Sequence, residues 1–235
     1  MNLDLDYLLT FLVYGLRYLP NTLYMTFLSL VFGVILGGLI AIVRTYKVKV
    51  LDPVLTALLA ILKAIPTNLI MVMSSIIFTA NFARVTEAWG IDMSLRDFNM
   101  TYLAAFALIL SAIASLSESI RGALMSVPKT QYDAGYSIGL TKTQNFIRIV
   151  LPQAFQVMLP SMMSNVTGLI KMTSLASTLG IMDVLNGCLQ KSGTSYRFLE
   201  AYLAAAIIYW VISILLELIG RTLEKGLGKY RRQAL

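Results

Sequence analysis

Two lysines stand inside long apolar stretches of the sequence, where a charged side chain is unexpected. Lys63 lies in the stretch 54–80, within "KAIPTNL", and Lys171 lies in the stretch 153–185, within "LIKMTSLAST". An ionisable residue in such surroundings needs a partner and is a functional candidate by default. The chemistry that a lysine offers there is the charge-assisted binding of a carboxylate.

Catalysis and metal binding have little support in this sequence. The chain contains no histidine, which excludes a histidine-based triad and the usual zinc peptidase motifs. Its single cysteine, Cys188, has neither a disulfide partner nor neighbouring metal ligands. The stretch "GLGKY" at 226–230 lacks the spacing and the hydroxyl residue of a phosphate-binding P-loop. We therefore expect no catalytic residue, no metal and no cofactor on this chain, so that any ATP is bound by another chain.

A polar segment, "YDAGYSIGLTKTQNFIRIVLPQAF" at 132–155, separates two long apolar runs. Tyr132, Tyr136 and Leu140 are spaced by four and would share one face of a short helix. Aromatic side chains on such a face suit a groove on a partner protein. An amphipathic helix that rests on lipid is the alternative reading of the same pattern.

The second half of this segment contains turn and cap residues. Gly139 permits a left-handed turn, and Thr141 or Thr143 can cap the helix that follows. Pro152 suits the first turn of the next apolar helix, where its missing N–H would have been unpaired. The segment therefore predicts a rigid, turned surface element.

The elements that must position these residues are membrane helices. The chain is 57% hydrophobic and only 13% charged, and its mean hydropathy is +0.75, far from the composition of a soluble domain. A helix needs about 20 apolar residues to cross the hydrocarbon core. We expect an all-α polytopic membrane protein, a single transmembrane domain over 1–235, with five spans at 21–43, 54–80, 101–125, 153–185 and 199–219.

Two of the expected spans carry polar or helix-breaking residues, so we expect each to be interrupted where protein lines the backbone. These residues are Lys63, Pro66 and Asn68 in the second span, and Pro160, Asn165, Gly168 and Lys171 in the fourth. The stretch 3–19 is apolar, but Asp4 and Asp6 stand where a signal peptide needs positive charge. We expect it to be an interfacial helix on the outer surface.

Basic residues fall mainly on one side of the five spans, and such an excess marks the cytoplasmic face. That side holds Arg44, Lys47, Lys49, Arg121, Lys129, Lys142, Arg148, Arg221, Lys225, Lys229, Arg231 and Arg232, and the other holds only Arg17, Arg84, Arg96, Lys191 and Arg197. We therefore expect the N-terminus outside and the C-terminus in the cytoplasm. Anionic membrane lipid accounts for the net charge of +7 without a nucleic acid partner.

The polar segment resembles the cytoplasmic "EAA" loop of ABC-importer membrane subunits. The matching residues are Asp133, Ala134, Gly135 and Gly139, followed by Phe146, Ile149, Leu151 and Pro152. Three further stretches, "SESIRGALMSVPKTQYDAG", "LIKMTSLASTLGIMDVL" and "KAIPTNL", resemble the polar amino acid branch of that family. Since the resemblance covers nearly the whole chain, the chain is identified as similar to the histidine, glutamine and cystine type of permease, which implies the type I ABC importer permease fold.

The resemblance implies that the loop 129–151 is a coupling helix that docks into a groove of an ATP-binding subunit. Asp133 would pair with a basic residue there, and the docking residues would be Tyr132, Asp133, Ala134, Gly135, Tyr136, Gly139 and Leu140. Two such subunits, with ATP and Mg²⁺, would drive two permease subunits, as a homodimer or heterodimer, from inward-open to outward-open. An extracytoplasmic solute-binding protein would deliver a polar or sulfur-containing amino acid such as cystine, across a bacterial plasma membrane.

The candidate solute pathway consists of polar residues in the second to fourth spans: Lys63, Pro66, Asn68, Glu118, Lys171, Thr173 and Ser174. The alternative for the two lysines is pairing with Glu118 or Asp183, or snorkelling to the interface.

Four residues depart from the family pattern: Thr130, Asp133, Gly135 and Met172. Asp133 is shorter than the usual Glu, and Gly135 weakens a helix relative to Ala. These departures predict altered coupling or solute preference.

Two other classes of protein compete with this interpretation. A carrier driven by an ion gradient needs acids within its spans, and Glu118, Asp183 and Glu217 lie only near span ends. A membrane scaffold would not need polar breaks in two spans. The motif "GVILG" at 33–37 predicts close helix approach, more readily within the subunit than between subunits.

Overall fold

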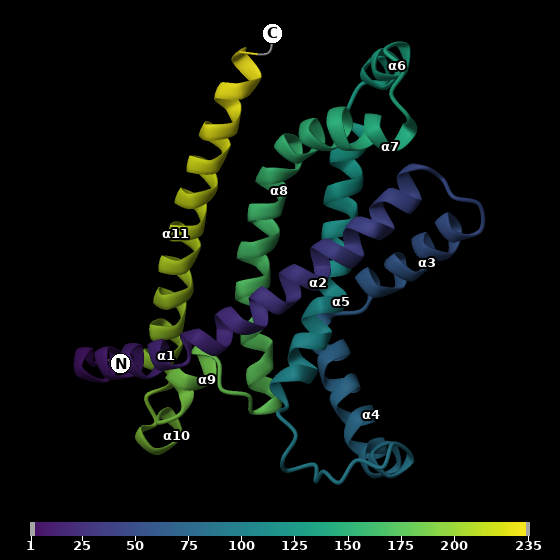
Figure 1. Ribbon diagram of the computed structural model, residues 1–235. Coiled ribbons are helices and arrows are strands. Elements are labelled where there is room, and N and C mark those ends of the chain that lie inside the picture. Colours follow the sequence, from purple (N-terminus) through teal and green to yellow (C-terminus); the bar gives the residue numbers. More distant parts are fainter. Residues whose placement is uncertain (1–2, 234–235) are drawn as a thin grey trace.

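The computed structural model of the protein (Figure 1) describes residues 3–233, with side chains described to residue 226. The described chain is helical and contains no strand, as expected. In chain order the helices are α1 (Leu5–Arg17), α2 (Leu19–Thr45), α3 (Leu51–Ala64), α4 (Thr67–Ala88), α5 (Thr101–Met125), α6 (Lys129–Ser137), α7 (Lys142–Asn145), α8 (Leu151–Met172), α9 (Val184–Leu189), α10 (Ser192–Ser195) and α11 (Phe198–Gln233), with a π-helical segment (Phe146–Val150) before α8 and a 3-10 segment (Thr173–Leu179) after it.

Helices α2 and α5 form the centre of the molecule because small residues let their backbones approach. A Cβ placed on Gly33 would lie 2.7 Å from the Cβ of Ala112, and one on Gly37 would lie 3.1 Å from the carbonyl oxygen of Ile113. The close approach predicted from "GVILG" is therefore present, and it lies within the subunit.

Adding one methyl group at Gly33 is expected to destabilise the protein. Because the facing atom is a Cβ fixed to the α5 backbone, Gly33→Ala must separate the helices, with an expected net loss of about 1 kcal/mol of unfolding free energy. Gly38→Ala is the matched control, since its nearest neighbour is the Cδ1 of Ile120 at 3.7 Å. Denaturant unfolding of both variants in mixed micelles compares their unfolding free energies. Equal values would show that α2 and α5 can separate at Gly33 without loss of stability.

Five helical segments are long and apolar enough to cross a membrane, in agreement with the number expected. They are Leu19–Thr45, Thr67–Ala88, Thr101–Met125, Lys142–Leu179 and Phe198–Gly226. The bounds 54–80 of the second span differ from the structure, because the chain breaks between α3 and α4 and the segment able to cross is Thr67–Ala88. Ile65 is extended (φ −89°, ψ 124°) and the ring of Pro66 disfavours helical geometry in the residue before it. The interruption expected there is present, and α3 stands apart from the crossing helix.

The interruption expected within the fourth span is present, but at the last of the four residues predicted to cause it. Helix α8 continues through Pro160, Asn165 and Gly168 and ends at Met172, directly after Lys171, so a break at the first three residues is wrong. A membrane helix tolerates an internal proline when neighbouring groups satisfy the freed carbonyl. The 3-10 segment that follows ends at Leu179 and is capped by Gly180, whose φ of +71° is left-handed.

The two ends of the molecule carry different elements (Figure 1). Helix α6, helix α7 and the C-terminal part of α11 lie at one end, and α1, α9 and α10 lie at the other. The stretch expected to be an interfacial helix forms α1, whose N-cap Asp4 accepts hydrogen bonds from the N–H groups of Asp6 and Tyr7. Its buried Phe11 packs with residues of α9 and α11. The side of the membrane on which each end lies stays a prediction, and Lys229, Arg231 and Arg232 lie outside the residues whose side chains are described.

Candidate functional site

The polar segment folds into a turned pair of short helices at one end of the molecule. Helix α6 ends at Ser137, and Gly139 adopts the predicted left-handed conformation (φ +81°). The N–H of Gly139 donates to Tyr136 O at 3.0 Å and that of Leu140 donates to Gly135 O at 3.1 Å, which closes the helix in a Schellman arrangement. Leu140 therefore lies beyond α6, and the prediction that it shares a face with the two tyrosines is wrong.

The second short helix, α7, begins where the sequence predicts. The Thr141 side chain accepts from the N–H of Gln144, and the Gln144 side chain accepts from the N–H of Thr141, so the two form a capping box. The π-helical segment then leads into α8, and Pro152 occupies the first turn as expected.

A buried asparagine fastens α6 to α7. Asn145 is fully buried, and its Nδ2 donates to Tyr132 O at 2.7 Å. It also fills the space beside Gly135, because a Cβ on Gly135 would lie 2.5 Å from Asn145 Oδ1. The glycine that sequence reasoning treats as a weakness of the helix is required by this contact. Nothing in the sequence alone points to Asn145.

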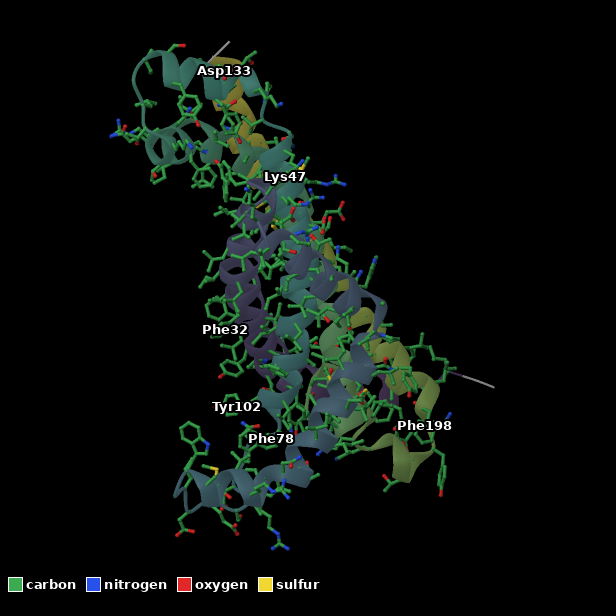
Figure 2. All side chains as sticks on the ribbon, turned by 90° about the vertical axis from the view of Figure 1, so that its right-hand side faces the viewer. Phe32, Lys47, Phe78, Tyr102, Asp133 and Phe198 are labelled. Atoms are coloured by element: carbon green, nitrogen blue, oxygen red, sulfur yellow. The ribbon has the colours of Figure 1, made fainter. Side chains whose placement is uncertain are left out.

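The two faces of α6 differ in character. Tyr132 is half-buried and packs with Phe146 against the core formed by α2, α5 and α8, and burial raises the pKa of its hydroxyl. Asp133 and Ala134, on the other faces of the helix, are exposed, and so is Tyr136, which lies one turn after Tyr132 on the same face. Figure 2 places Asp133 at the extreme end of the molecule, and Ile138, just beyond α6, is 75% exposed. The tip therefore offers an acid beside apolar side chains.

A cavity of about 550 Å³ lies among α3, α5 and α8, and we name it the Lys63 cavity. Its polar lining consists of hydroxyl groups, one amide and one ammonium group. The lining residues are Leu62, Lys63, Ile65, Thr67, Ser111, Ala114, Ser115, Ser119, Ser161, Ser164, Asn165, Gly168, Leu169 and Met172.

One carboxylate holds the charged wall of this cavity in place. Glu118 on α5 accepts from Arg44 of α2, and its oxygens lie 3.6 Å from Lys63 Nζ and 3.4 Å from Arg121 Nη2. Arg44 also approaches Asp52 of α3 at 4.0 Å. Pairing of Lys63 with Glu118, the structural alternative weighed from sequence, is therefore present. Arg44, expected only as a loop charge, is the most buried member of this network.

Lys171 lies elsewhere. It lines a second cavity of about 590 Å³ between α8 and α11, together with Glu217, Arg221 and Glu224. The structure shows no pairing of Lys171 with Glu118 or with Asp183 among the described residues. The two lysines thus line different cavities, which have Ser164 and Gly168 of α8 in common.

Asp183 has a structural role at the other end of the molecule. Its Oδ1 accepts from the N–H of Asn186 at 2.8 Å and its Oδ2 accepts from the hydroxyl of Tyr209 at 2.9 Å, so that it caps α9. Burial raises the pKa of the Asp183 carboxyl, and these hydrogen bonds oppose that rise.

The remaining pathway candidates do not gather around Lys63. Pro66 and Asn68 flank Thr67, which lines the Lys63 cavity, but neither is among the residues that line it. Thr173 is buried and its hydroxyl donates to Ile170 O at 2.7 Å, while the hydroxyl of Ser174 donates to Lys171 O at 2.7 Å. No cluster of three metal-ligating side chains occurs in the part of the chain that is described.

Comparison with known proteins identifies the family. The family described as "Binding-protein-dependent transport system inner membrane component" matches residues 29–229. The chain belongs to this family. Among related amino-acid ABC permeases, the L-cystine transport system permease protein TcyL of Bacillus subtilis is 37% identical over 90% of this chain and 86% of its own length. The nopaline transport system permease protein NocM of Agrobacterium fabrum is 30% identical over 91% of this chain and 87% of its own length.

Solved structures show the same fold in other ABC permeases. A chain from the crystal structure of an amino acid ABC transporter with histidines superposes with a TM-score of 0.77 at 21% identity, over 96% of this chain and 99% of that one. A chain of the MetNI methionine ABC transporter in an inward-facing conformation has a TM-score of 0.72 at 17% identity, over 97% and 99%. The protein is therefore a multi-pass membrane protein with the type I ABC importer permease fold, a permease subunit of an amino-acid ABC importer.

Proposed function

We propose that this permease works in an ATP-driven importer in which the α6–α7 pair docks on an ATP-binding subunit. The observation that carries the proposal is the tip of α6, where Asp133, Tyr136 and the C-cap Ile138 are all exposed on a pair of helices fastened by Asn145. A projecting element transmits force only if its base is rigid. Closure of two ATP-binding subunits around ATP and Mg²⁺ would then move the permease through these helices.

The Lys63 cavity is the proposed solute site of this permease. It lies among α3, α5 and α8, and Lys63 offers a cation to the carboxylate that every amino acid carries. A solute-binding protein outside the cell would deliver the amino acid, and a second permease subunit, identical or related, would complete the passage. The solutes named for the relatives differ, and a sulfur-containing amino acid such as cystine is one candidate.

The docking proposal is tested with a variant of the α6 tip. Asp133→Lys combined with Gly139→Val reverses the exposed charge and places a β-branched residue at a φ of +81°, where it is strained. We expect ATP-driven amino acid uptake to be lost while membrane insertion is kept. The measurement is co-purification of an ATP-binding subunit in mild detergent, together with ATP hydrolysis by the eluate.

A matched control lies at the opposite end of the molecule. Gly90 also has a left-handed φ, of +64°, and Asp92 is exposed two residues later. Asp92→Lys with Gly90→Val should leave the ATP-binding subunit bound. Normal ATP-driven uptake by the Asp133/Gly139 variant, or transport by the chain alone on an ion gradient, would contradict the proposed function.

A further inference from the structure

We propose that the Lys63 cavity admits amino acids of zero or negative net charge and rejects those with a net positive charge. The proposal rests on the function proposed above and names the class of solute that the same site takes. Its volume of about 550 Å³ lies within the usual range for small-molecule sites. The chemistry of its walls, considered group by group, decides which solutes it suits.

The charged wall suits a carboxylate. The Lys63 side chain keeps 45% exposure, and its Nζ lies 3.6 Å from Glu118, which is longer than an ordinary hydrogen bond. Glu118 has closer partners in Arg44 and Arg121. The ammonium group therefore retains donors that a solute carboxylate can accept.

The uncharged walls present mainly acceptors. The hydroxyl of Ser115 donates to Ser111 O at 3.1 Å, that of Ser161 to Met158 O at 2.9 Å, and that of Ser164 to Pro160 O at 3.2 Å. Each hydroxyl hydrogen is thus occupied by a helix carbonyl, and the oxygen keeps lone pairs.

The amide of Asn165 also uses its donor within the protein and leaves its oxygen as an acceptor. Asn165 Nδ2 donates to Ser119 Oγ at 3.0 Å and to Ser161 O at 2.8 Å. Neutral oxygen acceptors of this kind suit the α-ammonium group of an amino acid.

The balance of charge disfavours a second cation. Among the described residues that line the cavity, Lys63 is charged and none is acidic. In the network behind it, Arg44, Lys63 and Arg121 face only Glu118 and Asp52, so one positive charge remains in excess. A basic side chain would enter this field without a carboxylate to meet it, and like charges in a medium of low polarity repel strongly. A neutral side chain or a second carboxylate meets no such barrier.

The test measures the preference of the permease itself, without a solute-binding protein. The full chain, with any membrane subunit that co-purifies, is placed in lipid nanodiscs and its equilibrium binding of radiolabelled L-glutamine, L-glutamate and L-lysine is measured. We expect saturable binding of glutamine and glutamate, and binding of lysine that is at least about tenfold weaker. Lys63→Met should remove most of that difference.

A second variant avoids the ion network in case Lys63→Met impairs folding. Ser115→Asp adds a carboxylate to the cavity wall and should raise lysine binding relative to glutamine by about tenfold. Ser213→Asp is the matched control. Ser213 lines the other cavity, and its hydroxyl also donates to the carbonyl one turn earlier, Tyr209 O at 2.7 Å. This control should leave the ratio unchanged.

Three results of the binding measurements would overturn the proposal. They are equal binding of lysine and glutamine, no binding of any of the three amino acids, and an equal change of ratio in the Ser115 and Ser213 variants. ATP-driven uptake without a charge preference would refute this inference and leave the proposed function intact. A preference that persists while transport depends on an ion gradient would refute the proposed function instead.

Discussion

Replacing Glu118 by alanine is expected to destabilise the protein by about 2–3 kcal/mol. The carboxylate joins three helices, because it meets Arg44 of α2, Lys63 of α3 and Arg121 of its own helix. Its removal leaves three cations close together, one of which, Arg44, has only 8% of its side chain exposed. The expected loss is below that of a fully buried pair because 32% of the Glu118 side chain is exposed.

The control for this prediction is Glu217→Ala. Glu217 also pairs with an arginine, Arg221, at 2.7 Å, but these side chains are 62% and 66% exposed. An exposed pair one helical turn apart contributes only about 0.3–0.5 kcal/mol. Denaturant unfolding of the purified chain in mixed micelles compares the two. Equal losses would mean that Glu118 is an ordinary surface charge and that its network does not hold α3 against α5.

The helices and their breaks could be predicted largely from the sequence, because single residues decide them. Pro66 ends α3 through its effect on Ile65, Gly139 supplies a left-handed turn, and Thr141 caps α7. Each of these effects acts within a few residues along the chain. The error at Pro160 has the opposite origin, since the neighbours that let a membrane helix pass through a proline are tertiary contacts.

The candidate sites are harder to predict from the sequence, because they depend on contacts between residues that are far apart in the chain. The sequence singles out Lys63 as an isolated charge, but the serines that line the same cavity come from α5 and α8 and look like ordinary small residues of a membrane helix. Arg44 has the sequence signal of a loop charge, because only the packing of α2 against α5 brings it to Glu118. Lys171, like Lys63, is a charge inside an apolar stretch of the sequence, yet it lines a different cavity.

The two candidate sites are parts of one packed unit. Tyr132 of α6 and Phe146 pack against a core that includes Leu116 and Ala123 of α5, and α5 also carries Glu118. A displacement of the α6–α7 pair would therefore press on the helix that holds the charged wall of the Lys63 cavity. This continuity is a mechanical route between the proposed docking tip and the proposed solute site.

Replacing Gly135 by alanine is expected to destabilise the α6–α7 pair, although alanine is the better helix former. The added methyl group would lie 2.5 Å from Asn145 Oδ1, 2.6 Å from its Cγ and 2.7 Å from its Nδ2. Asn145 cannot withdraw easily, because it is fully buried and its Nδ2 donates to Tyr132 O. Overpacking of this kind costs about 1–3 kcal/mol. We expect that loss in unfolding free energy, together with weaker retention of the ATP-binding subunit in a pull-down.

Gly122→Ala is the control for helix propensity. A Cβ at Gly122 would meet nothing within 4 Å, so this substitution should stabilise α5 by about 0.5–1 kcal/mol. Asn145→Ser tests the contact between residues 135 and 145. It shortens the side chain that faces Gly135 and also removes the hydrogen bond from Asn145 Nδ2 to Tyr132 O. If Gly135 and Asn145 are complementary, the double variant Gly135→Ala with Asn145→Ser will be more stable than the sum of the single losses by about 1 kcal/mol. Additive losses, or an equal gain from alanine at Gly135 and Gly122, would show that Asn145 does not set the geometry of the α6–α7 pair.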